Sequence, residues 1–173
     1  MMKNNFSNKA LSLSKEILLD IEELIDPPEE GFSAETNQIV LISIVRGTRG
    51  YIERVVNQVN GCYEKGWFDS CAVMIRRLLE TLIIECFEKH EISDKILNKH
   101  GDFYYLKDLI DRMLAEKTWN LGRNTKNALP KLKDIGDKSA HSRRFNAQLN
   151  DIKDLIPEIR LVVQELVYLA QLK

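Results

Sequence analysis

The sequence predicts an all-α protein, an up-and-down bundle of about six to seven helices in a single domain spanning residues 1–173. The chain contains only eight glycines and four prolines, so little of it is suited to loops. Apolar residues recur at intervals of three and four along most of its length, which is the spacing of helices with one buried face. No useful stretch alternates polar and apolar residues with period two, so no sheet is predicted.

The first 33 residues are predicted to form an acidic helix and a linker, ahead of a core bundle over residues 34–173. Eight acidic residues and no basic ones lie between Glu16 and Glu35, while Pro27 and Pro28 end the first helix. The next helical pattern runs from residue 39 to residue 59. Two glycines within residues 46–51 predict a kink there, or a place where another helix packs closely.

The central helix is predicted over Trp67–His90, because this segment has the widest apolar face. Arg76 and Glu80 lie four residues apart and are expected to pair on its surface. A short helix at residues 92–99 and an amphipathic helix at residues 103–117 follow. Residues 119–127 are typical of a loop. The last helix is predicted over residues 147–173, with Pro157 kinking or dividing it.

The stretch Leu132–Phe145 is the part of the chain best suited to chemistry. Its pattern predicts a helix that ends at Gly136, with Asp137 or Ser139 capping a new helix that has His141 in its first turn. Such a helix start favours phosphate. Four cations surround it: Lys133, Lys138, Arg143 and Arg144. The alternative interpretation is that His141 only caps a helix end and that the cations form a solvated loop.

The charge distribution suggests partners, although the net charge is only −1. Nine basic and three acidic residues lie between Arg112 and Arg144. This asymmetry is typical of a nucleic-acid-binding face, of complementary faces that pair in a homodimer, or of a merely solvated surface.

Compartment and cofactors are predicted from what the sequence lacks. The three cysteines form no C-x-x-C pair, which favours reduced thiols over zinc or disulfides. A polar N-terminus and the lack of a long apolar run predict a cytoplasmic protein without a membrane segment. The chain has no metal-binding or cofactor-binding motif, so we expect no metal and no cofactor.

Two stretches of the sequence carry a family resemblance. They read Tyr63-Glu-Lys-Gly-Trp-Phe-Asp-Ser-Cys-Ala-Val-Met-Ile-Arg-Arg-Leu-Leu-Glu80 and Ile135-Gly-Asp-Lys-Ser-Ala-His141. Together they resemble an uncharacterised branch of the HEPN superfamily (higher eukaryotes and prokaryotes nucleotide-binding), over roughly residues 39–172. The resemblance implies a helical bundle, often dimeric, found in toxin–antitoxin, restriction and antiphage systems. Its active members are metal-independent ribonucleases, in which an arginine precedes a histidine at a helix start.

The resemblance also implies roles for individual residues. His141 would act as acid or base, but Asp134, Ile135 and Gly136 occupy the positions of the signature arginine, and Lys133 lies one residue too early. We therefore predict a non-catalytic HEPN-like module that binds RNA or a protein partner, such as an antitoxin or a defence subunit, with His141 buried and structural. The alternative is a metal-independent endoribonuclease that uses His141 and Lys133. The expected anion-binding residues are Lys131, Lys138, Arg143 and Arg144, and the expected motif-supporting residues are Arg76, Arg77, Glu80, Gly136 and Asp137.

Overall fold

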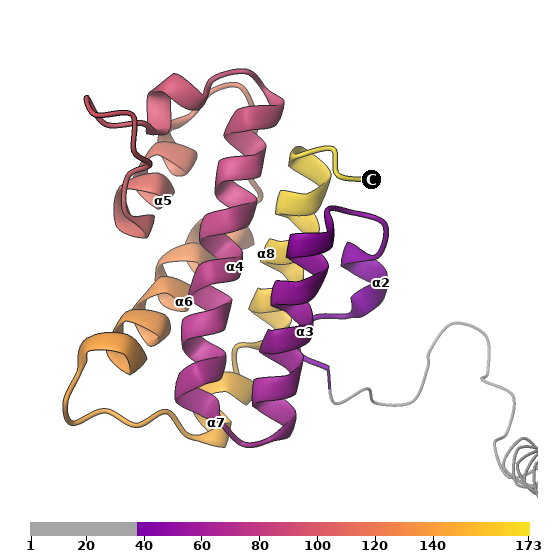
Figure 1. Cartoon of the computed structure of the whole chain (residues 1–173), viewed down its shortest axis with the longest axis vertical. Coiled ribbons are helices and arrows are strands. Elements are labelled where there is room, and N and C mark those ends of the chain that lie inside the picture. Colours follow the sequence, from indigo (N-terminus) through magenta and orange to yellow (C-terminus); the bar gives the residue numbers. More distant parts are fainter. Residues whose placement is uncertain (1–37) are drawn as a thin grey trace, which may run out of the picture. The chain divides into compact units, whose positions relative to one another are not determined.

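The structure, a computed structural model, describes residues 38–173 (Figure 1). The acidic helix and linker predicted for residues 1–33 lie outside this part of the chain. The described residues fold into helices joined by loops, with one isolated β-bridge between Leu97 and Phe103, so the predicted all-α bundle is confirmed. The helices are α2 (Ile42–Val45), α3 (Gly50–Glu64), α4 (Phe68–Lys89), the 3-10 helix η1 (Ser93–Ile96), α5 (Leu106–Ala115), α6 (Arg123–His141), α7 (Leu149–Lys153) and α8 (Ile156–Leu169).

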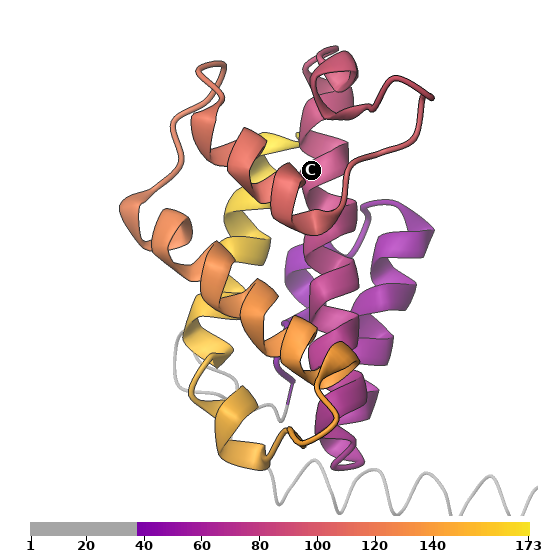
Figure 2. The same cartoon turned by 90° about the vertical axis from the view of Figure 1, so that its left-hand side faces the viewer.

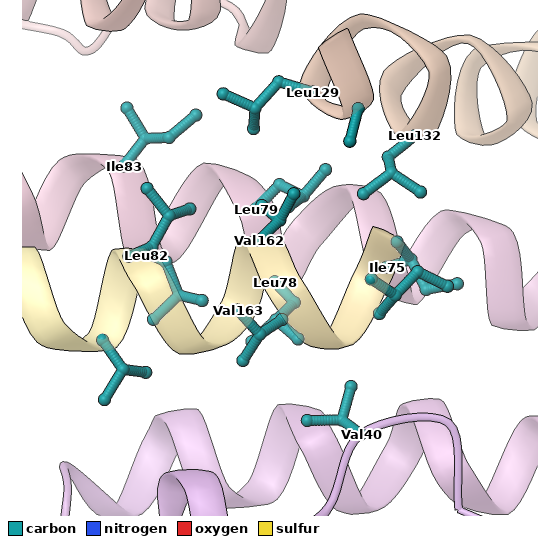
Figure 3. Close-up of a cluster of buried hydrophobic side chains, with 14 of the residues drawn as sticks. Val40, Ile75, Leu78, Leu79, Leu82, Ile83, Leu129, Leu132, Val162 and Val163 are labelled. Carbon is teal, nitrogen blue, oxygen red and sulfur yellow. The ribbon is translucent and has the colours of Figure 1, made fainter. Parts of the chain in front are cut away.

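Helix α4 lies at the centre of the bundle, as its wide apolar face predicts. It packs against α3, α5, α6 and α8. Figure 3 shows its side chains in one cluster with those of α6 and α8. The labelled residues of α4 are Ile75, Leu78, Leu79, Leu82 and Ile83, and all of them are buried. Since each buried side chain of this size stabilises the fold by about 1.5–3 kcal/mol, α4 anchors the elements that carry the candidate site.

Two predicted helices are divided. The pattern at residues 39–59 forms two helices, α2 and α3, because Gly47 adopts a φ of +82°, which a right-handed helix cannot contain. The interruption is therefore a break and not a kink. The C-terminal pattern forms α7 and α8, and Pro157 lies in the first turn of α8, where its missing N–H is not required.

Helix α6 begins earlier than its sequence predicts. Residues 123–127, expected in a loop, form its first turn, because a side chain from α8 caps it. The Glu165 carboxylate accepts hydrogen bonds from the Gly122 backbone N–H at 2.6 Å and from the Thr125 hydroxyl. This negative charge also suits the positive end of the helix dipole. The cap comes from a residue some forty positions away, so local sequence could not indicate it.

A strap formed by residues 38–40 closes one side of the bundle. The Asn60 side chain of α3 accepts from the Val40 N–H at 3.0 Å and donates to the Val40 carbonyl at 2.9 Å. Arg160 of α8 donates to the carbonyls of Gln38 and Ile39, at 2.6 and 3.0 Å. Ile39 and Val40 are completely buried. The strap is thus part of the core.

Candidate functional site

The helix end predicted at Gly136 is wrong. Helix α6 continues unbroken through Gly136 to His141, and Figure 2 shows it running obliquely across α4. A Cβ atom on Gly136 would lie 2.8 Å from the Arg76 Cβ and 3.0 Å from the Ala72 carbonyl oxygen. Such distances are shorter than ordinary van der Waals contacts. Gly136 therefore serves the close approach of two helices instead of ending one.

An ion-pair cluster lies beside this glycine. Arg76 Nε of α4 donates to Asp137 Oδ1 at 2.8 Å, and Lys133 Nζ donates to Asp137 Oδ2 at 2.7 Å. Lys133 also contacts Asp134 Oδ1 at 3.4 Å. We call Ala72, Arg76, Lys133, Gly136 and Asp137 the motif crossing. It joins the two stretches of sequence that carry the family resemblance.

The pKa values in the motif crossing shift in the directions expected for paired charges. Burial alone would raise the pKa of Asp137, but hydrogen bonds from Lys133 and Arg76, together with their positive charges, lower it below its usual value. The hydrogen bond to Asp137 raises the pKa of Lys133. Both groups are therefore charged at neutral pH. The Lys133 charge is balanced by its carboxylate partners.

The structure brings together only some of the predicted motif-supporting residues. Arg76, Gly136 and Asp137 meet in the motif crossing. The predicted surface pair of Arg76 with Glu80 is not formed, because Arg76 turns to Asp137. Within residues 38–173, neither Glu80 nor Arg77 makes an ion pair, and Arg77 is exposed.

Two residues take roles that the sequence does not predict. Ala72 supplies the carbonyl that faces Gly136. Ser139, expected to cap a new helix, lies inside α6, and its hydroxyl is buried without a hydrogen-bond partner in the part of the chain that the structure describes. One sequence signal could have indicated these roles. Leu132, Ile135, Gly136 and Ser139 follow one another at helical spacing on the inward face, and the last two are small. Small residues at helical spacing permit close helix packing as readily as they end a helix.

His141 is the last residue of α6 and is exposed, not in the first turn of a new helix and not buried. The carbonyl groups at this end of a helix favour cations. A helix start that binds phosphate is therefore absent at this position. Within residues 38–173 the imidazole makes no hydrogen bond to another side chain, so the prediction of a buried structural histidine is wrong.

Exposed cations surround the end of α6. Lys138, Arg143 and Arg144 are exposed and form no ion pair within residues 38–173. We call these three residues the basic turn. Lys131, the fourth predicted anion-binding residue, lies two helical turns earlier, about 10 Å from Lys138 along the axis. It lines a groove beside α8.

The groove next to Lys131 is mixed in charge. Its volume is about 520 Å³, and the side opposite α6 is formed by Pro157, Glu158 and Leu161 of α8 and by Asp154, which follows α7. Two carboxylates in the lining of the same groove reduce the attraction of Lys131 for phosphate. Of the predicted anion-binding residues, the structure therefore gathers Lys138, Arg143 and Arg144 and separates Lys131 from them.

The cysteines and acidic residues offer little other chemistry. Burial raises the pKa of the Cys71 and Cys86 thiols to about 12, so both stay protonated at neutral pH and are poor nucleophiles. All three cysteines, including the half-buried Cys62, are free. Between residues 38 and 173, no group of three His, Cys, Asp or Glu side chains is placed to hold a metal ion. No helix in that range has both the length and the apolarity needed to cross a membrane.

Comparison with known protein families gives a match. A family model described as a domain of unknown function (DUF4145) matches residues 57–173, from the middle of α3 to the C-terminal residue. Both stretches of the motif crossing lie within the match. Neither the curated proteins nor the solved structures give a match.

Proposed function

Because the chain belongs to the DUF4145 family, whose description assigns no activity, we propose a function from its own residues: a non-catalytic module that binds RNA through the basic turn. The observation that carries the proposal is the contrast between the paired cations of the motif crossing and the cations at the end of α6 and in the loop after it. Arg76 and Lys133 are paired with Asp137, whereas Lys138, Arg143 and Arg144 are exposed and unpaired within residues 38–173. Exposed cations that are not neutralised by carboxylates are the groups that contact a phosphate backbone.

The placement of His141 and Lys133 supports a non-catalytic role. An imidazole that acts as acid or base has to be held within hydrogen-bond reach of the proton that it transfers. His141 is exposed at a helix end, with no side-chain partner to orient it among the described residues. Lys133, the cation nearest to the position of the signature arginine, is bound to Asp137 at 2.7 Å. It is therefore poorly placed to stabilise the charge of a reacting phosphate.

Salt dependence tests RNA binding. Wild-type affinity for RNA should fall steeply as salt rises, because each phosphate contact releases counterions. Replacing Lys138, Arg143 and Arg144 together by alanine should reduce the slope of log affinity against log salt by about 2 to 3. The matched control replaces one exposed lysine and two exposed arginines elsewhere, Lys107, Arg46 and Arg54, by alanine. The control should retain the wild-type slope.

The same experiment separates the competing functions. Absence of RNA binding at low salt would exclude this proposal and favour a protein partner. Cleavage of RNA in the presence of a chelator, lost in a His141→Ala variant that melts like the wild type, would instead establish a ribonuclease. A result in which the control triple variant weakens binding as much as the basic-turn variant would show that binding is not localised to this turn.

The predicted homodimer is part of the proposal. The acidic segment that motivated it lies outside the described residues, so light scattering of the full chain is the direct measurement. A monomer at all accessible concentrations would exclude self-association.

A further inference from the structure

An exposed tryptophan lies at the start of α4. Trp67 is 63% exposed, whereas Trp119 is 8% exposed and donates its indole N–H to the Met113 carbonyl at 3.2 Å. An indole is among the largest apolar surfaces that a side chain can bury. Because this surface is exposed on Trp67, its indole is available to contact a ligand or another molecule.

Backbone hydrogen bonds fix the position of Trp67 between two helices. Gly66 adopts a φ of +73° and ends α3, with hydrogen bonds from the Trp67 N–H to the Cys62 carbonyl at 2.8 Å and from the Gly66 N–H to the Tyr63 carbonyl at 3.0 Å. This pair of bonds is the Schellman motif, which fixes the direction of the chain after a helix. The Trp67 carbonyl then accepts from the Cys71 N–H at 2.8 Å, in the first turn of α4. A ligand that stacks on this indole therefore meets a backbone that is already ordered.

Trp67 and the basic turn lie at the same end of the bundle. The Asp69 carboxylate of α4 accepts a hydrogen bond from the Ala147 N–H at 2.9 Å, which ties the loop after α6 to the start of α4. Figure 1 shows the turn between α3 and α4 and the loop between α6 and α7 together at the lower end. Trp67 is two residues from Asp69, and Arg144 is three residues from Ala147. Three residues of extended chain span at most about 11 Å.

We propose that Trp67 is a stacking platform for an unpaired base of single-stranded RNA whose phosphates contact the basic turn. This inference rests on the proposed function and narrows its ligand from RNA in general to unpaired strands. Cations beside an aromatic ring provide both the attraction for the backbone and a surface for a base. In a duplex both faces of a base are covered by its neighbours, so a single strand suits an exposed indole better.

The experiment compares a single strand with the same strand paired to its complement. The probe is a mixed-sequence RNA of about 12 nucleotides, and binding to the full chain is measured by fluorescence anisotropy and by quenching of tryptophan emission. Trp67→Ala should weaken single-strand binding about tenfold and leave the salt slope and duplex affinity unchanged. Trp67→Phe, which keeps a ring, should recover most of the affinity. Tyr105→Ala is the matched control, since this ring is 83% exposed on another part of the surface.

The outcomes distinguish the two proposals. If Trp67→Ala binds the single strand as tightly as the wild type while the basic-turn variant does not, stacking is excluded and RNA binding remains. If the wild type binds neither form of RNA, both proposals fail. Wild-type emission that is quenched by the single strand, but not after Trp67→Phe, supports stacking even if Trp67→Ala proves poorly folded.

Discussion

The motif crossing and the basic turn differ in environment although they are adjacent in sequence. In the crossing, two cations share the carboxylate of Asp137 beside a glycine that lies against α4. Lys138, the next residue, and His141, one helical turn after Asp137, are exposed, and Arg143 and Arg144 follow in the loop. One short motif can thus pack two helices together with some of its residues and expose cations to solvent with others. Resemblance in such a motif is thus evidence of a shared fold first.

The largest expected effect is on packing at Gly136. Gly136→Ala should lower the free energy of unfolding by about 2 kcal/mol, because its Cβ would overlap the Arg76 side chain and the Ala72 backbone. The control is Gly61→Ala in α3, where nothing lies within 4 Å of the added Cβ. That change should raise stability by about 0.5–1 kcal/mol through helix propensity. Urea denaturation measures the free energy of unfolding of both variants. Equal changes in the two would contradict a close approach of α6 and α4 at Gly136.

The next largest effect on stability is expected from the ion pairs of Asp137. Asp137→Asn should cost about 1–2 kcal/mol at neutral pH, because Arg76 and Lys133 would lose their charged partner. The lowered pKa of Asp137 means that its contribution is present above its usual pKa of 3.8 and is lost as pH falls through the lower folded value. The raised pKa of Lys133 means that its contribution is present below 10.5 and is lost at higher pH. The stability difference between wild type and variant should therefore be constant between these limits and shrink outside them.

Asp134→Asn provides the control for this electrostatic prediction. The Asp134 side chain is 64% exposed and contacts Lys133 only at 3.4 Å. Its replacement should change stability by less than about 0.5 kcal/mol. If Asp134→Asn lowered stability as much as Asp137→Asn, stability would depend on the net charge of this region and not on the ion pair between Asp137 and Arg76 of α4.

A smaller and opposite effect is expected at Ser139. Its hydroxyl is buried and has no hydrogen-bond partner within residues 38–173. Ser139→Ala should therefore raise stability by about 1 kcal/mol, since an unsatisfied polar group is removed and alanine is the better helix former. Thermal denaturation measures the change. A lower melting temperature would reveal a partner for this hydroxyl.

The smallest effects are expected in the basic turn. His141→Ala, and the triple alanine variant of Lys138, Arg143 and Arg144, should each change stability by less than about 0.5 kcal/mol, because these side chains are exposed. Calorimetry compares their melting temperatures with the wild type. A large loss in either variant would mean that this surface is structural, and the contrast with the motif crossing would disappear.

The sequence predicted the elements whose helical signal is local. The central helix, expected over Trp67–His90, forms at Phe68–Lys89, because its long apolar face needs no further information. Pro157 likewise separates α7 from α8 as its chemistry requires. The start of α6 was missed because its cap, Glu165, comes from another helix.

The candidate site was less predictable for the same reason. A glycine at this position could either end a helix or let a second helix approach closely. Which of the two occurs depends on Ala72 and Arg76, about sixty residues earlier. Arg76 had a local candidate partner in Glu80, yet it pairs with Asp137 across the crossing. Residue types indicated the cations correctly, but only tertiary contacts show which of them are exposed.

The strap of residues 38–40 determines where a recombinant fragment of this chain should begin. The family match begins at residue 57, inside α3, and a protein trimmed to that boundary would lack Ile39 and Val40. Asn60, only 8% exposed, would then face the solvent or an empty space with its amide unpaired. A recombinant fragment should therefore start at or before residue 37, so that the strap is kept, although the family match begins only at residue 57.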